Sequence, residues 1–305
     1  MTKKTLVIIG ARGIGDLIYH LPLLRSLYKT YNKKIHILSN HVSQAKDVFI
    51  NENFYEEIRY FDNTRYNIFQ TIRNIINFRN LINSYNVDQV VLTSNATRLT
   101  LPVLLSKISK KIILGQGKLL FNKDKSLDHL TISERLMIYT NNLQLPKKEN
   151  NFLLKKGSLE KGIRDKKNYF ISIDSHHDHN NWDKEYYIRL IEKIKNPNKI
   201  YINFSPNKEY FLKFFPKKFF QSEIFEFTYK KKISEIIEII NQCDVVIGNE
   251  SGPVCLASSL NKVVHAIYLP VHTKPESRII NSNNKYYNAK NQAPDEIINK
   301  IISSL

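Results

Sequence analysis

Three glycines and a carboxylate come together near the start of the chain, in the segment IIGARGIGDLIYHLPLLRSL. Gly10, Gly13 and Gly15 look like the start of a nucleotide-binding loop, in which backbone N–H groups face a phosphate. Asp16 follows at the beginning of a helix, where a carboxylate would repel a phosphate bound by the same helix end. Two interpretations remain open: Asp16 caps its helix in a structural loop, or it has a chemical task and the phosphates bind elsewhere.

A second candidate site lies in the segment CDVVIGNESGPVCLASSL. A buried strand leads into a helix of small residues through Glu250, Ser251, Gly252 and Pro253. Free N–H groups, a hydroxyl and the positive end of a helix dipole can together hold a diphosphate. The same residues also fit an ordinary strand–turn–helix, with Ser251 as N-cap and Pro253 near the first helical position.

The segment DSHHDH places three histidines within four positions, at residues 176–179. Side chains this crowded rarely converge on a tetrahedral metal, so we expect a loop at a strand end and no metal site. No Asp-x-Asp motif is present to bind a divalent ion. A protonated histidine of this segment would instead place a positive charge beside a bound diphosphate, and Lys184 is another candidate for that charge.

The composition restricts the classes of partner and compartment. The net charge of +18 favours a polyanionic partner or an anionic membrane surface, although a composition rich in Lys, Asn and Ile is also typical of AT-rich genomes. No nucleic-acid motif is recognisable, so nucleic acid rests on charge alone. Cys243 and Cys255 are too few for a disulfide framework, which indicates a reducing cytoplasm. No apolar run approaches the roughly 20 residues that cross a bilayer, and Arg12 and Asp16 argue against a signal peptide.

Strands that alternate with helices predict an α/β protein with parallel sheets covered on both faces. The predicted strands are residues 5–10, 34–40, 56–62, 88–94, 110–116, 169–174, 199–205, 223–228, 243–249 and 263–269. They divide the chain into a Rossmann-like domain (1–150), a polar linker (151–167) and a second Rossmann-like domain (168–305), whose last helix could pack back on the first. Ligands of such sheets bind beyond the carboxyl ends of the strands, so we expect the chemistry in a central cleft. The strand at 34–40 lacks the terminal acidic residue of a dinucleotide site, which argues against a dehydrogenase.

Several motifs together resemble glycosyltransferase family 9, the heptosyltransferase-like enzymes. GIGDLIYHLPLLRSL is similar to the family's N-terminal motif, in which Ile-Gly-Asp precedes a helix containing proline. NESGPVCLASSLNKVVHAIY resembles its nucleotide-sugar motif, Asp-Ser/Thr-Gly-Pro-x-His-x-Ala-x-x-Leu. NNWDKEYYIRLIEKI, which contains Trp182, resembles the central segment, and DHLTISERLMIYTNNLQL the helix that closes the first domain. The resemblance spans nearly the whole chain in the right order.

The resemblance implies a GT-B type fold and an inverting, metal-independent transfer of heptose or a similar sugar. The donor would be a nucleotide-diphosphate sugar such as ADP-heptose, and the acceptor a lipopolysaccharide core or related surface glycan. The N-terminal domain would take the acceptor at Gly13 and Gly15, with Asp16 as general base, and a helix dipole would lower the pKa of Asp16. The donor-binding residues implied are Ser175, His177, Asn180, Glu250, Ser251, Gly252, Pro253 and Cys255.

The chain departs from the family pattern at several of these positions. The family's lysine before the tryptophan is Asn180, its histidine is Cys255, and its aspartate before the serine is Glu250. The usual Pro-Gly-x-Ser/Thr appears as DSHHDH. These departures leave a non-catalytic nucleotide-sugar or glycan-binding module as an alternative, beside a basic nucleic-acid-binding protein. For the enzyme we expect no cofactor, a cytoplasmic location on the inner face of the inner membrane, and an anionic lipid-linked acceptor.

Overall fold

The computed structural model of the chain describes residues 3–10, 13–61, 68–94, 96–115, 126, 130, 132–155, 165–175, 181–269, 281 and 283–305. It divides the chain into two compact units, residues 1–152 and 153–305. The division falls at the start of the expected linker, of which residues 156–164 lie outside the described part. No helix in the described part is long and apolar enough to span a membrane.

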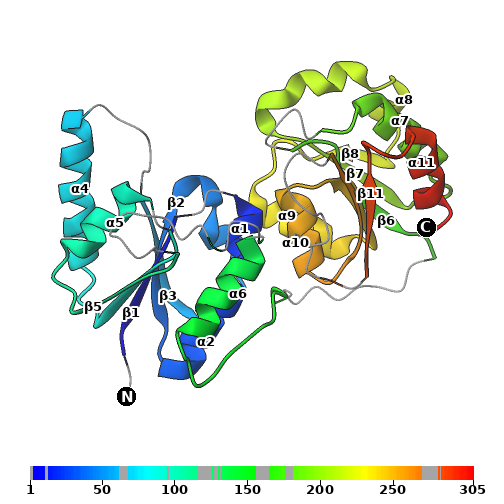
Figure 1. Ribbon diagram of the computed structural model, residues 1–305. Helices are drawn as coiled ribbons and strands as arrows, with labels where there is room; N and C mark the ends of the chain where they lie inside the picture. Colours follow the sequence, from blue (N-terminus) through cyan, green and yellow to red (C-terminus); the bar gives the residue numbers. More distant parts are fainter. Residues whose placement is uncertain are drawn as a thin grey trace. The chain divides into compact units, whose positions relative to one another are not determined.

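The first unit is built on a parallel sheet of five strands in the order β3-β2-β1-β4-β5 (Figure 1). The central strand β1 is buried along its whole length, which explains its unbroken apolar sequence TLVII. Helices α4 and α5 cover one face of the sheet, and α1, α2 and α6 cover the other (Figure 1). The strands are β1 (Thr5–Ile9), β2 (Ile35–Asn40), β3 (Tyr55–Phe61), β4 (Gln89–Leu92) and β5 (Lys110–Ile113). The helices are α1 (Ile14–Tyr19), α2 (Leu21–Tyr31), η1 (His41–Ser43), α3 (Ala45–Val48), α4 (Ile68–Asn83), α5 (Thr97–Leu104) and α6 (Ile132–Asn142).

The first helical segment is broken in two at His20. Pro22 lies in the first turn of α2, a position where its missing N–H needs no helical partner. The first backbone hydrogen bond of α2 runs from the N–H of Leu24 to the carbonyl of His20 at 3.0 Å. Pro22 thus lies where the helix starts again after the break, and α1 is only six residues long.

The second unit has a parallel sheet of six strands in the order β11-β10-β9-β6-β7-β8. The strands are β6 (Asn168–Ser172), β7 (Lys199–Asn203), β8 (Phe225–Phe227), β9 (Val245–Asn249), β10 (Val263–Tyr268) and β11 (Asn284–Asn288). The helices are α7 (Lys184–Lys193), η4 (Pro206–Phe214), α8 (Lys218–Gln221), α9 (Ile233–Gln242), α10 (Gly252–Ser259) and α11 (Pro294–Ile302). The parallel α/β fold predicted from the alternation is thus present in both units.

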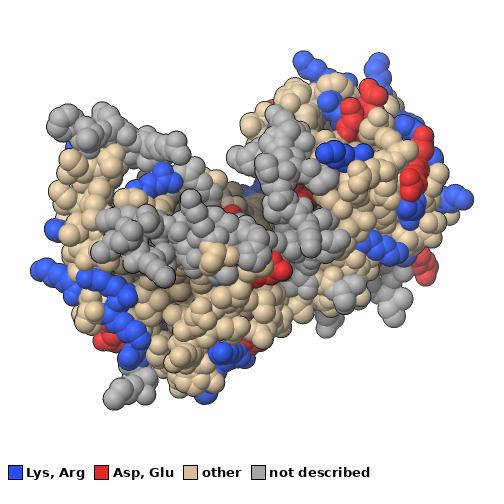
Figure 2. Space-filling model, in the orientation of Figure 1, with Lys and Arg blue, Asp and Glu red and all other residues tan. Residues whose placement is uncertain are grey.

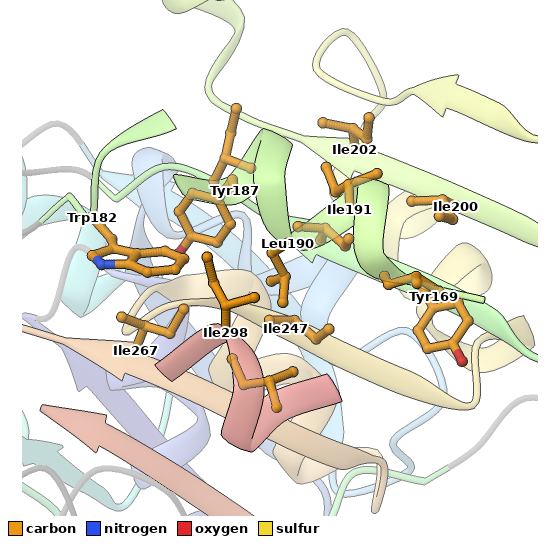
Figure 3. Packing of buried hydrophobic residues seen from close by; sticks show 14 of the residues in the cluster. Tyr169, Trp182, Tyr187, Leu190, Ile191, Ile200, Ile202, Ile247, Ile267 and Ile298 are labelled. Carbon is orange, nitrogen blue, oxygen red and sulfur yellow. The ribbon is translucent and has the colours of Figure 1, made fainter. Parts of the chain in front are cut away.

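Apolar side chains from α7, α11 and the central strands form one core in this unit (Figure 3). Trp182 packs edge-on against Tyr187 with 5.0 Å between ring centroids, and both rings are almost fully buried. Figure 3 shows these two rings together with Ile267 and Ile298. The only tryptophan of the chain is therefore a core residue that fixes the start of α7.

Two features at the end of the chain did not follow from the sequence. Strand β11 was not predicted, because its sequence NKYYN lacks a run of apolar residues, but it pairs with β10 at the edge of the sheet. For helix α11, the sequence left open that it packs back on the first domain. It packs instead on α7 within its own unit, where Ile297, Ile298 and Ile301 are buried in the core (Figure 1).

Candidate functional site

Asp16 is the third residue of α1, the helix that follows the loop beyond the carboxyl end of β1. Its Oδ2 accepts a hydrogen bond from the N–H of Gly13 at 3.3 Å, so the carboxylate caps the first turn of its helix. The residue is half-buried. This contact gives Asp16 the helix-capping role that was one of its two interpretations. Its catalytic role stays a prediction.

The tightest steric requirement in the glycine loop lies at Gly10. Gly13 has φ −86° and ψ 150°, an extended conformation that any residue adopts, and Gly15 lies in the first turn of α1. The backbone angles of Gly13 therefore do not demand glycine, and the acceptor role of Gly13 and Gly15 stays a prediction. The steric requirement lies at Gly10, where an added Cβ would come within 2.4 Å of Cβ of Ser94. Gly10 thus lets the β1 loop pass close to the segment after β4.

His20 connects the turn that carries Asp16 to the sheet, a role that the sequence did not reveal. Its Nδ1 donates to the carbonyl of Asp16 at 2.7 Å, because a carbonyl can only accept. The other nitrogen, Nε2, then accepts from the hydroxyl of Thr93 at 2.8 Å, just beyond β4. The ring is buried and neutral, and burial lowers the pKa of His20 to about 4. These bonds hold the backbone of Asp16 against β4.

Acid is expected to destabilise the protein between pH 6.5 and about 4, since two buried histidines are neutral when folded. Burial lowers the pKa of both His20 and His265 to about 4 from 6.5, and Lys285 adds to the effect at His265. In this range the unfolded chain binds more protons. The stabilisation from the two neutral histidines is therefore fully present above pH 6.5. The free energy of unfolding falls as the pH is lowered toward 4, by about 3 kcal/mol per histidine.

Denaturant titrations near pH 7 and near pH 4 measure this loss. The variant His20→Asn keeps a donor for the carbonyl of Asp16 but does not titrate. It should be less stable than the native chain at neutral pH and lose less stability on acidification. Equal losses in the two chains would exclude His20 as a source of acid sensitivity.

In the second unit, the carboxyl ends of β6 and β9 lie together. Gly248 is paired with Ser172 across these strands, and an added Cβ at Gly248 would come within 2.4 Å of the carbonyl oxygen of Ser172. The hydroxyls of Ser172 and Ser251 are 3.5 Å apart. Ser251 is the N-cap of α10, but its side chain makes no capping hydrogen bond. The side chain of Ser251 therefore leaves the N–H groups of Gly252 and Val254 uncapped, so they can donate to an anion, whereas Pro253 has no N–H and the N–H of Cys255 bonds to the carbonyl of Ser251.

Asn249, at the end of β9, provides a buried donor next to this helix end. Its Oδ1 accepts from the N–H of Trp182 at 2.9 Å, which fixes the orientation of the amide. Its Nδ2 has no hydrogen-bond partner among the described residues, although Asn249 is fully buried. Leaving a buried donor unsatisfied is costly, so this amide suits a site that a ligand completes. A polar residue that ends an apolar strand just before the Glu-Ser-Gly-Pro segment was the signal for Asn249 in the sequence.

A buried ion pair joins the ends of β6 and β7. Lys208 Nζ lies 2.5 Å from Asp174 Oδ1, and it also donates to the carbonyl of Ser175 at 3.3 Å. The other carboxylate oxygen of Asp174 accepts from the backbone N–H and the hydroxyl of Ser205. Burial raises the pKa of Tyr187 well above its usual value, and the charge of Asp174 acts in the same direction. Lys208 was not predicted, because only the tertiary fold brings the start of η4 to β6.

The predicted donor residues are only partly accounted for. Ser175 is buried and donates its N–H to Asn181 Oδ1 at 2.7 Å. His177 and Asn180 lie outside the described residues. Cys255 is buried on α10, and Glu250, Ser251, Gly252 and Pro253 are half-buried at the start of this helix.

Of the residues considered for positive charge or metal binding, only Lys184 lies in the described part of the chain. The ammonium of Lys184 lies 4.2 Å from the ring centroid of Phe214. In the described part of the chain, no three His, Cys, Asp or Glu side chains are grouped so that they could hold a metal ion. The three histidines of residues 176–179 are not in that part, so the metal alternative is untested.

Comparison with known proteins identifies the family. The family model described as glycosyltransferase family 9 (heptosyltransferase) matches residues 107–301, which include the whole α10 region but not the Asp16 loop. A comparison with curated protein sequences found no match.

Three solved structures share the fold over almost the entire chain. A glycosyltransferase family 9 protein of Veillonella parvula has 15% identity and a TM-score of 0.71, and the match covers 95% of this chain and 87% of that one. E. coli ADP-heptose lps heptosyltransferase II has 13% identity, a TM-score of 0.72 and 98% coverage of both chains. E. coli heptosyltransferase WaaC with ADP has 13% identity, a TM-score of 0.67 and 98% coverage of both. The chain thus has the GT-B type fold of these proteins; it belongs to glycosyltransferase family 9, and it is a glycosyltransferase.

Proposed function

We propose that the protein transfers heptose or a similar sugar from a nucleotide-diphosphate donor to a hydroxyl of a surface-glycan acceptor. The observation that carries the donor assignment is the start of α10, where uncapped N–H groups lie next to the unsatisfied amide of Asn249. Neutral donors and a helix dipole can hold a diphosphate without a metal. The structure of E. coli heptosyltransferase WaaC contains ADP, which supports ADP-heptose as the donor class.

Asp16 is the proposed general base. In an inverting transfer the acceptor hydroxyl oxygen bonds to the anomeric carbon, the bond from that carbon to the diphosphate breaks, and the nucleoside diphosphate leaves. The hydroxyl proton passes to the carboxylate of Asp16. Asp16 stands beyond a strand end of the first unit, whereas the candidate anion site is in the second unit, so its charge does not occupy the phosphate site.

The acceptor in this proposal is an anionic, lipid-linked glycan such as a lipopolysaccharide core. The protein would work in the cytoplasm on the inner face of the inner membrane, where the acceptor is anchored. The net charge of +18 supports attraction to such a surface.

The alternatives are weaker. On the face shown in Figure 2, Lys and Arg side chains are scattered among other residues, with acidic groups between some of them. A nucleic-acid-binding surface would concentrate positive charge along one patch or stripe. The non-catalytic nucleotide-sugar module that Asn180 and Cys255 left open is disfavoured, because the chain belongs to a glycosyltransferase family.

Calorimetry with ADP, UDP and GDP tests the donor assignment. We expect at least one of them to bind, with equal affinity with and without a chelator. The variant Asn249→Asp keeps the acceptor for Trp182 but replaces a donor by a negative charge, so the affinity should fall at least about tenfold. The control Asn168→Asp changes another buried asparagine, at the opposite end of β6. The affinity of Asn168→Asp for the nucleotide should be the same as that of the native chain. Absence of binding to every nucleotide would refute the donor assignment, and a strong chelator effect would refute metal independence.

A further inference from the structure

Exposed aromatic rings gather in one short segment of the second unit. Tyr210, Phe214 and Phe220 are 51%, 45% and 52% exposed, and Ile224 is 37% exposed. Ten large apolar side chains are exposed in the described part of the chain, and four of them lie within the short segment 210–224. Scattered single apolar residues are ordinary on a protein surface, whereas a group of this kind marks an interaction site.

The exposed rings belong to one continuous aromatic layer. Tyr210 and Phe214 both contact Phe211, with centroid distances of 4.9 and 6.4 Å. Phe220 stacks on Phe227 at 5.0 Å. Phe204 contacts both Phe211 and Phe227, at 5.6 and 6.4 Å, and so joins the two groups. The outer rings are therefore supported by a rigid inner layer over β7 and β8.

Lysines alternate with the exposed rings. Lys213, Lys217 and Lys218 are all exposed between Tyr210 and Phe220. Lys218 pairs with Glu192 of α7, which lies beside α8 (Figure 1). Lys213 and Lys217 form no ion pair with any described residue. The acidic Glu209 of the same segment is paired with Lys230, so the segment presents a net positive charge.

We propose that this aromatic–lysine surface, made of Tyr210, Lys213, Phe214, Lys217, Lys218 and Phe220, docks the protein on an anionic phospholipid membrane. Aromatic rings are favoured at the level of the lipid headgroups, and lysines are attracted to anionic lipids. An amphipathic surface with both features binds in the interface without spanning the bilayer. The inference rests on the proposed function, since a lipid-linked acceptor requires the enzyme at the membrane.

Charge favours a membrane over a second copy of the chain on this surface. Two copies that met through these residues would bring at least six lysines together, and like charges close together are destabilising. Anionic lipid headgroups complement the same lysines. The surface is built on two short helical elements, η4 and the four-residue α8.

Co-sedimentation of the full chain with vesicles tests the proposal. The vesicles contain phosphatidylcholine and phosphatidylglycerol in equal parts, and pure phosphatidylcholine vesicles serve as the neutral comparison. The double variant Phe214→Ser/Phe220→Ser should lower binding about tenfold or more by removing the apolar contact. The triple variant Lys213→Gln/Lys217→Gln/Lys218→Gln should lower it roughly a hundredfold at low salt, at about fivefold for each lysine.

Matched controls separate this surface from the general positive charge of the chain. Val263→Ser removes another exposed apolar side chain of the same unit, and Lys195→Gln/Lys290→Gln removes two other exposed lysines. Both should bind vesicles almost as the native chain does. Binding of ADP, measured in parallel, checks that every variant is folded and tests the donor site independently.

The outcomes are distinct. Vesicle binding lost only in the surface variants, with ADP binding intact, supports the proposal. Vesicle binding that falls equally in the controls, or is absent in the native chain, overturns it and leaves the donor site standing. A concentration-dependent dimer that Phe214→Ser/Phe220→Ser dissolves, without vesicle binding, assigns the surface to a second copy and also overturns it.

Discussion

Replacement of Asp16 by asparagine is expected to lower the rate of sugar transfer by roughly 10²–10⁴, the usual contribution of a positioned base. Asparagine has nearly the same shape, and its carbonyl oxygen can still accept the hydrogen bond from the N–H of Gly13. The cap of α1 therefore survives while the proton acceptor is lost. Donor affinity should not change, because the candidate donor site lies in the other unit.

The measurement is turnover and donor affinity for the native chain and Asp16→Asn side by side. Asp47→Asn is the matched control, since Asp47 is also a half-buried carboxylate in the first turn of a helix, α3. It should leave turnover unchanged. Equal turnover in Asp16→Asn would remove Asp16 from the mechanism. Donor binding without turnover in the native chain would contradict the proposed transfer.

The second large effect is expected at the buried ion pair. Lys208→Met should lower the free energy of unfolding by about 3–5 kcal/mol, because it leaves the carboxylate of Asp174 buried without its cation. The side chains of Asp174 and Lys208 are only 1% and 9% exposed, so water cannot replace the lost partner. In Lys208→Met/Asp174→Asn no charge is left unpaired, so much of the stability should return.

Denaturant unfolding of these variants measures the effect. Arg189→Met provides the control, because Arg189 and Asp295 form an ion pair whose side chains are 44% and 61% exposed. Exposed pairs contribute at most about 1 kcal/mol, so this variant should be nearly as stable as the native chain. A loss in Lys208→Met no larger than that in Arg189→Met would show that the buried pair does not hold β6 and β7 together.

Local pattern was sufficient for most of the fold. Continuous apolar runs such as TLVII and VVIGN predict buried strands, because a parallel sheet covered on both faces excludes water from every side chain. The helix of residues 233–242 repeats isoleucine at helical spacing, and its buried side is the isoleucine side. The pattern did not predict β11, an edge strand with few apolar residues. It also did not show that α11 packs on α7, a helix about 100 residues earlier in the chain.

The sequence by itself determined the parallel α/β class, the candidate carboxylate Asp16, the Ser-Gly-Pro helix start and the resemblance to a glycosyltransferase family. These depend on residue types at short spacing, which local geometry and hydrophobic burial control. Only the tertiary structure decided that Thr93 anchors the His20 ring that holds Asp16, that an added Cβ at Gly10 would clash with Ser94, and that Lys208 neutralises Asp174. Each of these contacts joins segments tens of residues apart, or depends on a close approach of backbones. Hydrophobic periodicity carries no information on such pairs, because it records which side chains are buried and not which of them meet.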